Sequence, residues 1–198
     1  MELDALVVDA GDPMELATFW QRVLGGRLRN DSESVVLTAS GIPPMRFRPQ
    51  ELPKTVKNRV HPDVWVNDIS SLLDLGATVL AEYLPERTTL ADPEGNEFCA
   101  FLAPRSDPTP PAALFAVCVD SDRPEELAAW WAAQVGARIG PGTDGTPRWL
   151  YDSAGWQEVI WKFVRVTDVR VTPNRWRWAV RGPGSALRDP QGNEFERV

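Results

Sequence analysis

The sequence repeats itself, and this repeat constrains the fold more than any other feature. Residues 6–9 and 16–20 resemble residues 117–120 and 127–131, each 111 positions further along the chain. The last block of the repeat, DPEGNEF at residues 92–98, agrees at six of seven positions with DPQGNEF, which begins 97 positions later. Self-similarity of this kind predicts two copies of one structural unit.

A proline-rich segment separates the two copies. Residues 104–111 hold four prolines, which fix the backbone and donate no hydrogen bonds, so we expect an extended linker. The predicted organisation is a first domain at 1–103, a linker at 104–112 and a degenerate second domain at 113–198. The second copy is 19 residues shorter between its Asn-Arg pair and its last block. It should therefore lack the short helix predicted at 68–76.

Local patterns predict where the helices and strands lie. Asp12, Pro13 and Glu15 form a helix start, and Gly25 ends the helix. Asp92 to Gly95 has the composition of a type I turn that leads into a last strand. In the second copy, Gly182-Pro183-Gly184 should form a tight turn. The strand candidates of the first copy are 3–10, 35–38, 45–48 and 61–66.

Composition narrows the environment. The net charge of −7 argues against a nucleic-acid binder. The apolar runs are too short to span a bilayer, and the N-terminus has no secretory signal. Two cysteines, Cys99 and Cys118, favour free thiols in a reducing cytosol. We therefore expect a cytoplasmic protein without nucleic-acid or membrane partners.

The repeated pattern resembles the glyoxalase-like domains of the vicinal-oxygen-chelate superfamily, which includes glyoxalases, bleomycin-resistance proteins and dioxygenases. The resemblance rests on the opening strand, the Asp-Pro helix start, the Phe-Trp and Leu-Gly pairs, and the last Asp-Pro-x-Gly-Asn-Glu-Phe block. It implies an α+β fold of paired βαβββ modules, whose curled mixed sheets enclose a cavity.

The resemblance also implies four positions per domain that hold a divalent metal in family enzymes. Several of the residues at these positions in this chain cannot bind a metal ion. An alanine side chain has no ligand atom, an arginine stays protonated, and the ammonium of a lysine repels a cation. We therefore expect no metal and no other cofactor. A lysine or arginine should instead replace the metal's charge and bond to Glu196. The matching residues are Ala5, Arg46, His61 and Cys99 in the first copy, and Ala116, Lys162, Arg177 and Glu196 in the second.

The only histidine lies on a strand with other polar residues. Period-2 alternation puts Arg59, His61, Asp63 and Trp65 on one face. Such a face supports acid–base chemistry or grips an anion. The alternative is a hydrogen-bonded cluster that satisfies its own charges.

Cys99 shares its strand face with Glu97 and Phe101. It is a candidate nucleophile if His61 lowers its pKa. The alternative is a small buried hydrophobic side chain.

Five of the nine tryptophans cluster in the second copy. We expect them to cover the surface bared by the missing helix. They would do so either against the first copy or against another subunit, which makes a homodimer through the second domain a candidate partner. The five are Trp149, Trp156, Trp161, Trp176 and Trp178.

These observations favour a metal-independent protein that binds a small organic molecule in a pocket of the first copy. Arg46, Arg59 and His61 would suit a carboxylate or another anion. The alternative is a metal-free lyase or isomerase that uses His61 with Asp63 or Cys99 as catalytic residues. The candidate ligand-binding residues are Trp20, Arg46, Arg59, His61, Asp63, Trp65, Glu97 and Cys99.

Overall fold

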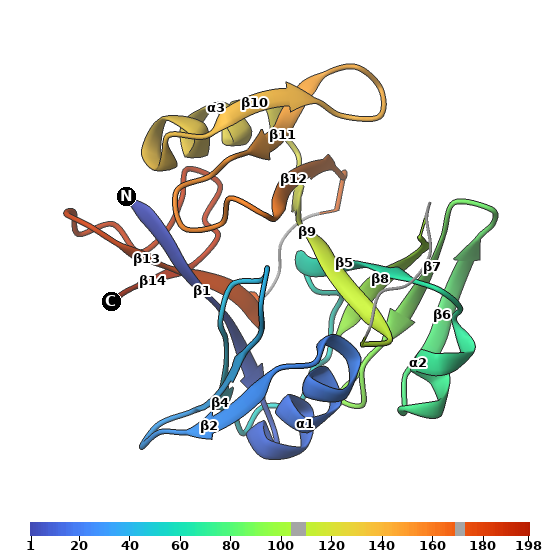
Figure 1. Ribbon diagram of the computed structural model, residues 1–198. Coiled ribbons are helices and arrows are strands. Elements are labelled where there is room, and N and C mark those ends of the chain that lie inside the picture. Colours follow the sequence, from blue (N-terminus) through green and yellow to red (C-terminus); the bar gives the residue numbers. More distant parts are fainter. Residues whose placement is uncertain (104–109, 169–172) are drawn as a thin grey trace.

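The computed structural model describes residues 1–103, 110–168 and 173–198, and it shows an α+β fold with two mixed sheets (Figure 1). Residues 104–109 of the expected linker lie outside the described residues. The elements of the first repeat are β1 (Glu2–Ala10), α1 (Pro13–Leu24), β2 (Arg27–Asn30), β3 (Val35–Thr38), β4 (Met45–Pro49), β5 (Val60–Val66), α2 (Ser70–Asp74), β6 (Thr78–Tyr83), β7 (Arg87–Ala91) and β8 (Glu97–Leu102). Those of the second are β9 (Ala112–Ser121), α3 (Pro124–Val135), β10 (Arg138–Pro141), β11 (Pro147–Tyr151), β12 (Ile160–Arg165), β13 (Trp176–Arg181) and β14 (Phe195–Arg197).

Each sheet is built from both repeats. Sheet A has the strand order β14-β13-β1-β4-β3-β2, and sheet B has the order β10-β11-β12-β9-β5-β8-β7-β6. The repeats join where β1 pairs antiparallel with β13, and where β5 pairs antiparallel with β9. Both sheets therefore consist of βαβββ-like modules, and the sequence boundary at the linker does not divide either of them. The two chain ends lie close together beside sheet A (Figure 1).

The second repeat has one helix where the first has two, as the shortened sequence predicts. Among the described residues of that repeat, α3 is the helix that forms. A turn follows β13, and Gly182 and Gly184 adopt φ angles of 126° and 120° there. Residues with a Cβ rarely adopt such angles, which explains the two glycines. None of the described helices combines the length and the apolarity that crossing a bilayer requires.

The predicted helix start of α1 is confirmed. The Oδ1 atom of Asp12 accepts hydrogen bonds from the amides of Met14 and Glu15 at 3.0 and 2.9 Å. These bonds satisfy amide groups that would otherwise lack partners in the first turn. The short helix α2 begins at Ser70, two positions inside the predicted range of 68–76, because Ile69 is its N-cap. The carboxylate of Asp68 still accepts from the amide of Ser71 at 2.8 Å.

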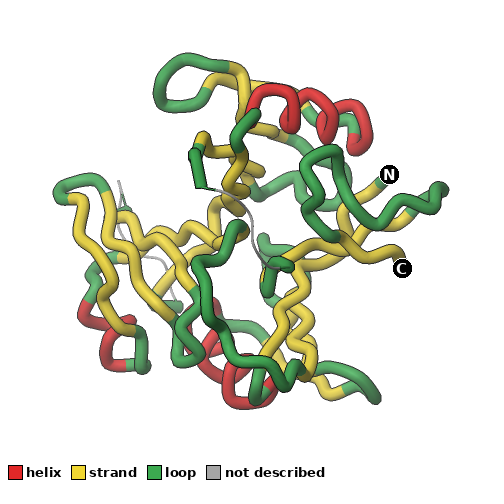
Figure 2. Tube along the Cα trace, turned by 180° about the vertical axis from the view of Figure 1, so that it is seen from behind, coloured by secondary structure: helices red, strands yellow, loops and turns green. Residues whose placement is uncertain are grey.

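Helices α1 and α3 lie at opposite ends of the molecule (Figure 2), and each contacts both sheets. One buried apolar cluster includes residues of both sheets and of both helices. Helix α1 packs on β3, β4 and β9, and α3 packs on β11, β12 and β1. Trp176 meets Trp20 with ring centroids 5.3 Å apart, and Trp178 meets Trp131 at the same separation. Four of the five clustered tryptophans are at most 2% exposed: Trp156, Trp161, Trp176 and Trp178. They fill the chain's own core, so they cannot form the surface of a homodimer.

A buried carboxylate connects the helix, the turn and the segment before β5. The Oδ1 atom of Asp92 accepts from the amides of Glu94 and Asn96, which closes the turn. Its Oδ2 atom accepts from Nε1 of Trp20 at 3.3 Å. The Nδ2 atom of Asn58 donates to Oδ1 of Asn96 at 3.1 Å. Burial, which outweighs these hydrogen bonds, raises the pKa of Asp92 to about 6.

The second repeat builds the same arrangement. Trp131 donates to Oδ2 of Asp189 at 3.3 Å, and Asn174 donates to Asn193 at 3.2 Å. Burial also raises the pKa of Asp189. The aspartate and the asparagine of the last block therefore have a structural role in both repeats, since they connect each helix to a turn and to the segment before a central strand.

The substitution Trp20→Phe should destabilise the protein more at pH 7 than at pH 5. The pKa of Asp92 rises from 3.8 to about 6 on folding, so this group costs stability as the pH rises through that range. Trp20 donates to the carboxylate, and its loss should cost roughly 1.5–3 kcal/mol once Asp92 is ionised. Urea unfolding at the two pH values measures the difference.

Trp156→Phe is the matched control. Trp156 is 2% exposed, and its indole nitrogen has no hydrogen-bond partner among the described residues. Its substitution should lower stability by the same amount at both pH values. A Trp20→Phe effect that is equally independent of pH would contradict the role given to Asp92.

Candidate functional site

One face of β5 carries polar side chains and forms part of the surface of sheet B, whereas the side chains of its other face pack in the core. Val60, Val64 and Val66 are fully buried in the core, whereas His61 and Trp65 are partly exposed. The predicted alternation along this strand is confirmed. Position 63 lies opposite Cys99 of β8 on one side and Ala116 of β9 on the other. The centre of this face therefore combines strands from both repeats.

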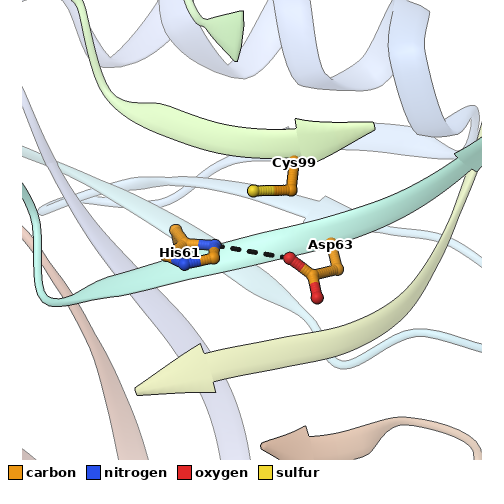
Figure 3. Close-up of side chains that lie close together, drawn as sticks. All are labelled: His61, Asp63 and Cys99. Carbon is orange, nitrogen blue, oxygen red and sulfur yellow. Dashed lines mark ion pairs between the residues drawn. The ribbon is translucent and has the colours of Figure 1, made fainter. Parts of the chain in front are cut away.

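Asp63 is the centre of a small polar cluster (Figure 3). Its Oδ1 atom lies 3.4 Å from Nδ1 of His61. Its Oδ2 atom accepts from Nζ of Lys162 at 3.0 Å and from Sγ of Cys118 at 3.1 Å. Asp63 is 2% exposed and Lys162 is 7% exposed. A buried carboxylate requires such partners, because burial without them would favour its neutral form.

Aromatic rings surround the ammonium group. Nζ of Lys162 lies 4.4 Å from the ring centroid of Phe115, 4.9 Å from that of Trp149 and 5.4 Å from that of Phe101. Trp65 stacks on Phe115 with centroids 4.1 Å apart. The negative faces of the rings stabilise a desolvated cation. Lys162 is therefore held as a fixed positive charge.

The charges of the cluster set the protonation of His61 and Asp63. Burial works against both charged forms. The attraction between the imidazole and the carboxylate outweighs it, so the pKa of His61 is raised and that of Asp63 is lowered. Lys162 contributes to the lowered pKa of Asp63. The dyad therefore favours a protonated imidazole beside an ionised carboxylate.

The cysteines do not have the properties of nucleophiles. Burial and the charge of Asp63 raise the pKa of Cys99 to about 11, and they raise that of Cys118 well above its ordinary range. Both thiols are free and buried. A neutral thiol attacks poorly, because the thiolate is the reactive form. His61 does not lower the pKa of Cys99, so the environment matches the small buried side chain of the alternative interpretation.

Other predicted site residues lie elsewhere. Trp20 is fully buried in the core, where its indole donates to Asp92. Arg46 lies on sheet A, where it pairs with Asp4 at 2.6 Å. Glu97 lies on β8 and pairs with Lys54 at 2.7 Å. Arg59 lies just before β5, and its guanidinium donates to the backbone carbonyl of Asp168.

The first repeat alone therefore does not build the polar face that carries His61, Asp63 and Cys99. Residues of β5 and β8 share their face with Cys118 and Lys162 of the second repeat. The reason is the strand pairing, since β5 joins β9 and not β1. The eight positions that the resemblance assigns to metal ligands are therefore grouped by sheet and not by repeat. Ala5, Arg46, Arg177 and Glu196 belong to sheet A, whereas His61, Cys99, Ala116 and Lys162 belong to sheet B.

The residues of sheet A do not fit a metal. Arg177 pairs with Glu196 at 2.7 Å and with Asp9 at 2.8 Å, and Arg48 also pairs with Glu196 at 2.7 Å. Arg46 and Arg181 both pair with Asp4. The prediction that an arginine or lysine bonds to Glu196 is confirmed.

The residues of sheet B come closer to a metal site but do not fit one either. Ligand atoms of His61, Asp63 and Cys99 lie within 4.8 Å of one another, and three protein ligands are the number found in catalytic zinc sites. The ammonium of Lys162, however, already bonds to Asp63. A divalent cation would meet a fixed positive charge in the same cluster.

The sequence analysis did not assign three members of the cluster to the site. They are Cys118, Phe115 and Trp149 of the second repeat. It identified Asp63 as a site residue but did not predict its bond to Lys162. Period-2 alternation from Ala116 would have put Cys118 on the same face. Phe115 carried no such signal, because a bulge in the pairing of β5 with β9 shifts the register beside it.

The imidazole of His61 should titrate above 6.5, its ordinary pKa. Because its pKa is raised on folding, His61 contributes stability below pH 6.5 and loses it as the pH rises through the folded value. In Asp63→Asn the midpoint of the His61 titration should fall below 6.5. Burial lowers the pKa of His61, and the charge of Asp63 no longer outweighs this effect in the variant. Proton NMR measures this directly, because the chain has one histidine.

Asp68→Asn is the control for this titration. Asp68 is exposed, and its carboxylate accepts from Ser70 and Ser71. The midpoint of His61 should stay unchanged in this variant. A midpoint that also stays unchanged in Asp63→Asn would show that Asp63 does not control the protonation of His61.

Comparison with known proteins agrees with this architecture. Residues 5–101 match the family described as Glyoxalase-like domain. A comparison with curated proteins found no significant match. Glyoxalase I from Zea mays has a similar structure, with a TM-score of 0.63 and 12% identity, over 100% of this chain and 92% of that one.

A Bacillus subtilis protein whose name places it among dioxygenases has a TM-score of 0.58 and 17% identity, over 91% of this chain and 70% of that one. Similarity at such low identity establishes the fold alone. Residues 5–101 therefore form a glyoxalase-like domain of the vicinal-oxygen-chelate superfamily, and the chain as a whole has the fold of glyoxalase I.

Proposed function

We propose that this protein binds a small organic molecule on the face of sheet B without a metal. The observation that carries this proposal is the ammonium of Lys162, which bonds to Asp63 at 3.0 Å in the middle of that face. Family enzymes place a metal ligand at this position. Lys162 and the imidazole of His61, whose protonated form is favoured, share the single carboxylate of Asp63. The cluster therefore keeps a net positive charge, which attracts an oxygen-rich ligand without a metal.

The side chains around Lys162 indicate the kind of ligand. Trp65, Phe101, Phe115 and Trp149 are partly exposed, so their rings offer a surface on which a planar apolar group stacks. The imidazole of His61 is 14% exposed and carries a raised pKa. It is suited to donate a hydrogen bond to a ligand oxygen. An apolar wall with a few convergent polar groups is the usual composition of a small-molecule site, and the proposal takes sheet B to curl around it.

The second candidate function is a metal-free lyase or isomerase. His61 and Asp63 support it, because a raised histidine pKa provides a proton donor near neutral pH. Cys99 does not support it, since its pKa of about 11 leaves the thiol neutral. The candidate catalytic residues therefore reduce to the His61–Asp63 pair. Turnover of a bound ligand that is lost in His61→Gln would favour this function over binding alone.

The purified protein should contain no stoichiometric transition metal, whereas Lys162→Glu should acquire zinc. The substitution removes the competing cation and adds a carboxylate beside His61, Asp63 and Cys99, which completes a four-ligand set. Dialysis against zinc followed by elemental analysis measures the metal content of both proteins.

Arg165→Glu is the control, because Arg165 lies on the same strand but its side chain is 53% exposed. This variant should take up no zinc. About one metal per chain in the unaltered protein, lost in His61→Ala, would contradict metal independence.

Aromatic carboxylates and phenols should include ligands that raise the melting temperature, and Trp65→Ala should weaken their binding about tenfold through the loss of stacking. His61→Ala should also weaken binding, because it removes the hydrogen-bond donor. A thermal-shift screen, followed by calorimetric titration of the hits, measures both effects.

Arg177→Ala changes the face of sheet A and serves as the comparison variant. Ligand stabilisation should survive this substitution, after correction for the lower stability of the variant itself. Stabilisation that survives His61→Ala and disappears in Arg177→Ala would move the site to sheet A.

A further inference from the structure

A hollow lies between two parts of the chain that connect the sheets. One side is formed by residues 52–59, between β4 and β5, and the other by Asp168 and residues 173–175, which are described residues between β12 and β13. Between them lies a cavity of about 390 Å³, a size in the range of small-molecule sites. We call it the crossover pocket, and its principal lining residues are Leu52, Val56, Arg59, Asp168, Pro173 and Arg175.

The walls of the crossover pocket are mainly apolar. Leu52 is 72% exposed and Val56 is 36% exposed, although both are hydrophobic side chains. Pro53 and Pro173 add apolar surface from the two sides of the pocket. Exposed hydrophobic groups that line a hollow indicate a binding surface more strongly than scattered ones do. The composition of these walls suits an aliphatic or other apolar group.

The charged groups of the pocket differ in how they are paired. Lys54 pairs with Glu97, Lys57 with Asp120 at 2.6 Å, and Arg175 with Glu94 at 3.3 Å. These carboxylates neutralise their cations. The guanidinium of Arg59 instead donates to the backbone carbonyl of Asp168, a neutral acceptor. Arg59 is 9% exposed, so its charge is largely removed from water. If the carboxylate of a ligand replaced this carbonyl as the acceptor, it would form a stronger, charge-assisted pair with Arg59.

We propose that the crossover pocket binds a small amphipathic carboxylate. Its carboxylate pairs with Arg59, and its apolar tail lies against Leu52, Val56 and Pro173. This site is distinct from the proposed site on sheet B, because its lining residues include none of the Lys162 cluster. A ligand here contacts both sides of the pocket and therefore stabilises their arrangement by mass action.

Three probes with the same apolar tail separate the contributions of charge and tail. They are octanoate, 1-octanol and octylammonium, titrated calorimetrically against the full chain. Octanoate should bind about tenfold more tightly than octanol, and octylammonium should bind most weakly, because Arg59 attracts one charge and repels the other. Equal affinity for octanoate and octanol would overturn the proposal, as would the absence of octanoate binding.

Substitutions locate the binding. Val56→Asp places a negative charge on the apolar wall and should weaken octanoate binding at least tenfold. The control is Leu187→Asp, because Leu187 is 56% exposed and lies outside the pocket. It should leave the affinity unchanged. Octanoate binding that is unaffected by Val56→Asp, or that is lost in Trp65→Ala, would place the ligand elsewhere and overturn the proposal.

Arg59→Gln tests the charge directly. The variant should bind octanoate and octanol equally, with the affinity of octanol unchanged. A retained tenfold preference for octanoate would overturn the role of Arg59. Because Arg59 also contacts Asp168, circular dichroism first establishes that this variant folds. If it does not, Val56→Asp and the three probes still decide the proposal, and neither depends on binding to sheet B.

Discussion

The hydrogen bond from a helix tryptophan to a buried aspartate is the interaction on which the rest of the structure depends. Trp20 donates to Asp92, and Trp131 donates to Asp189. Trp20 comes from the helix beside sheet A, whereas Asp92 opens the turn that precedes β8 of sheet B. Each bond therefore connects elements of different sheets. Burial raises the pKa of both carboxyl groups, so the connection exerts its full electrostatic effect only when the aspartates are ionised.

The pairing of strands across the repeats decides which charges meet. Lys162 of the second repeat meets Asp63 of the first, and Arg177 meets Asp9. A buried charge without a partner would cost several kcal/mol. The two repeats therefore stabilise each other electrostatically as well as through their shared core. This exchange also explains why neither repeat holds a complete polar face by itself.

The fixed cations change what this fold offers to a ligand. A bound metal attracts several ligand oxygens at once and depends on metal supply. A lysine or arginine provides a permanent charge with directional donors, and it favours the single anionic group that its geometry matches. On sheet A these donors are engaged by Asp4, Asp9 and Glu196. On sheet B the ammonium lies beside partly exposed rings, so the binding that we propose there would combine charge with stacking.

The sequence by itself determined the local features of this protein. The helix start at Asp12, the turn at Asp92 and the alternation from Val60 to Val66 follow from hydrogen bonding and periodicity among neighbouring residues. The missing helix of the second repeat follows from the 19 residues that this repeat lacks. The lack of metal-ligand atoms in the alanine and arginine side chains also holds in any fold. The tertiary structure decided which repeat pairs with which, that Trp20 is core, and that Asp63 bonds to Lys162. Those outcomes depend on pairing between β5 and β9, whose contacts join residues far apart in the chain, and no local pattern encodes such a pairing.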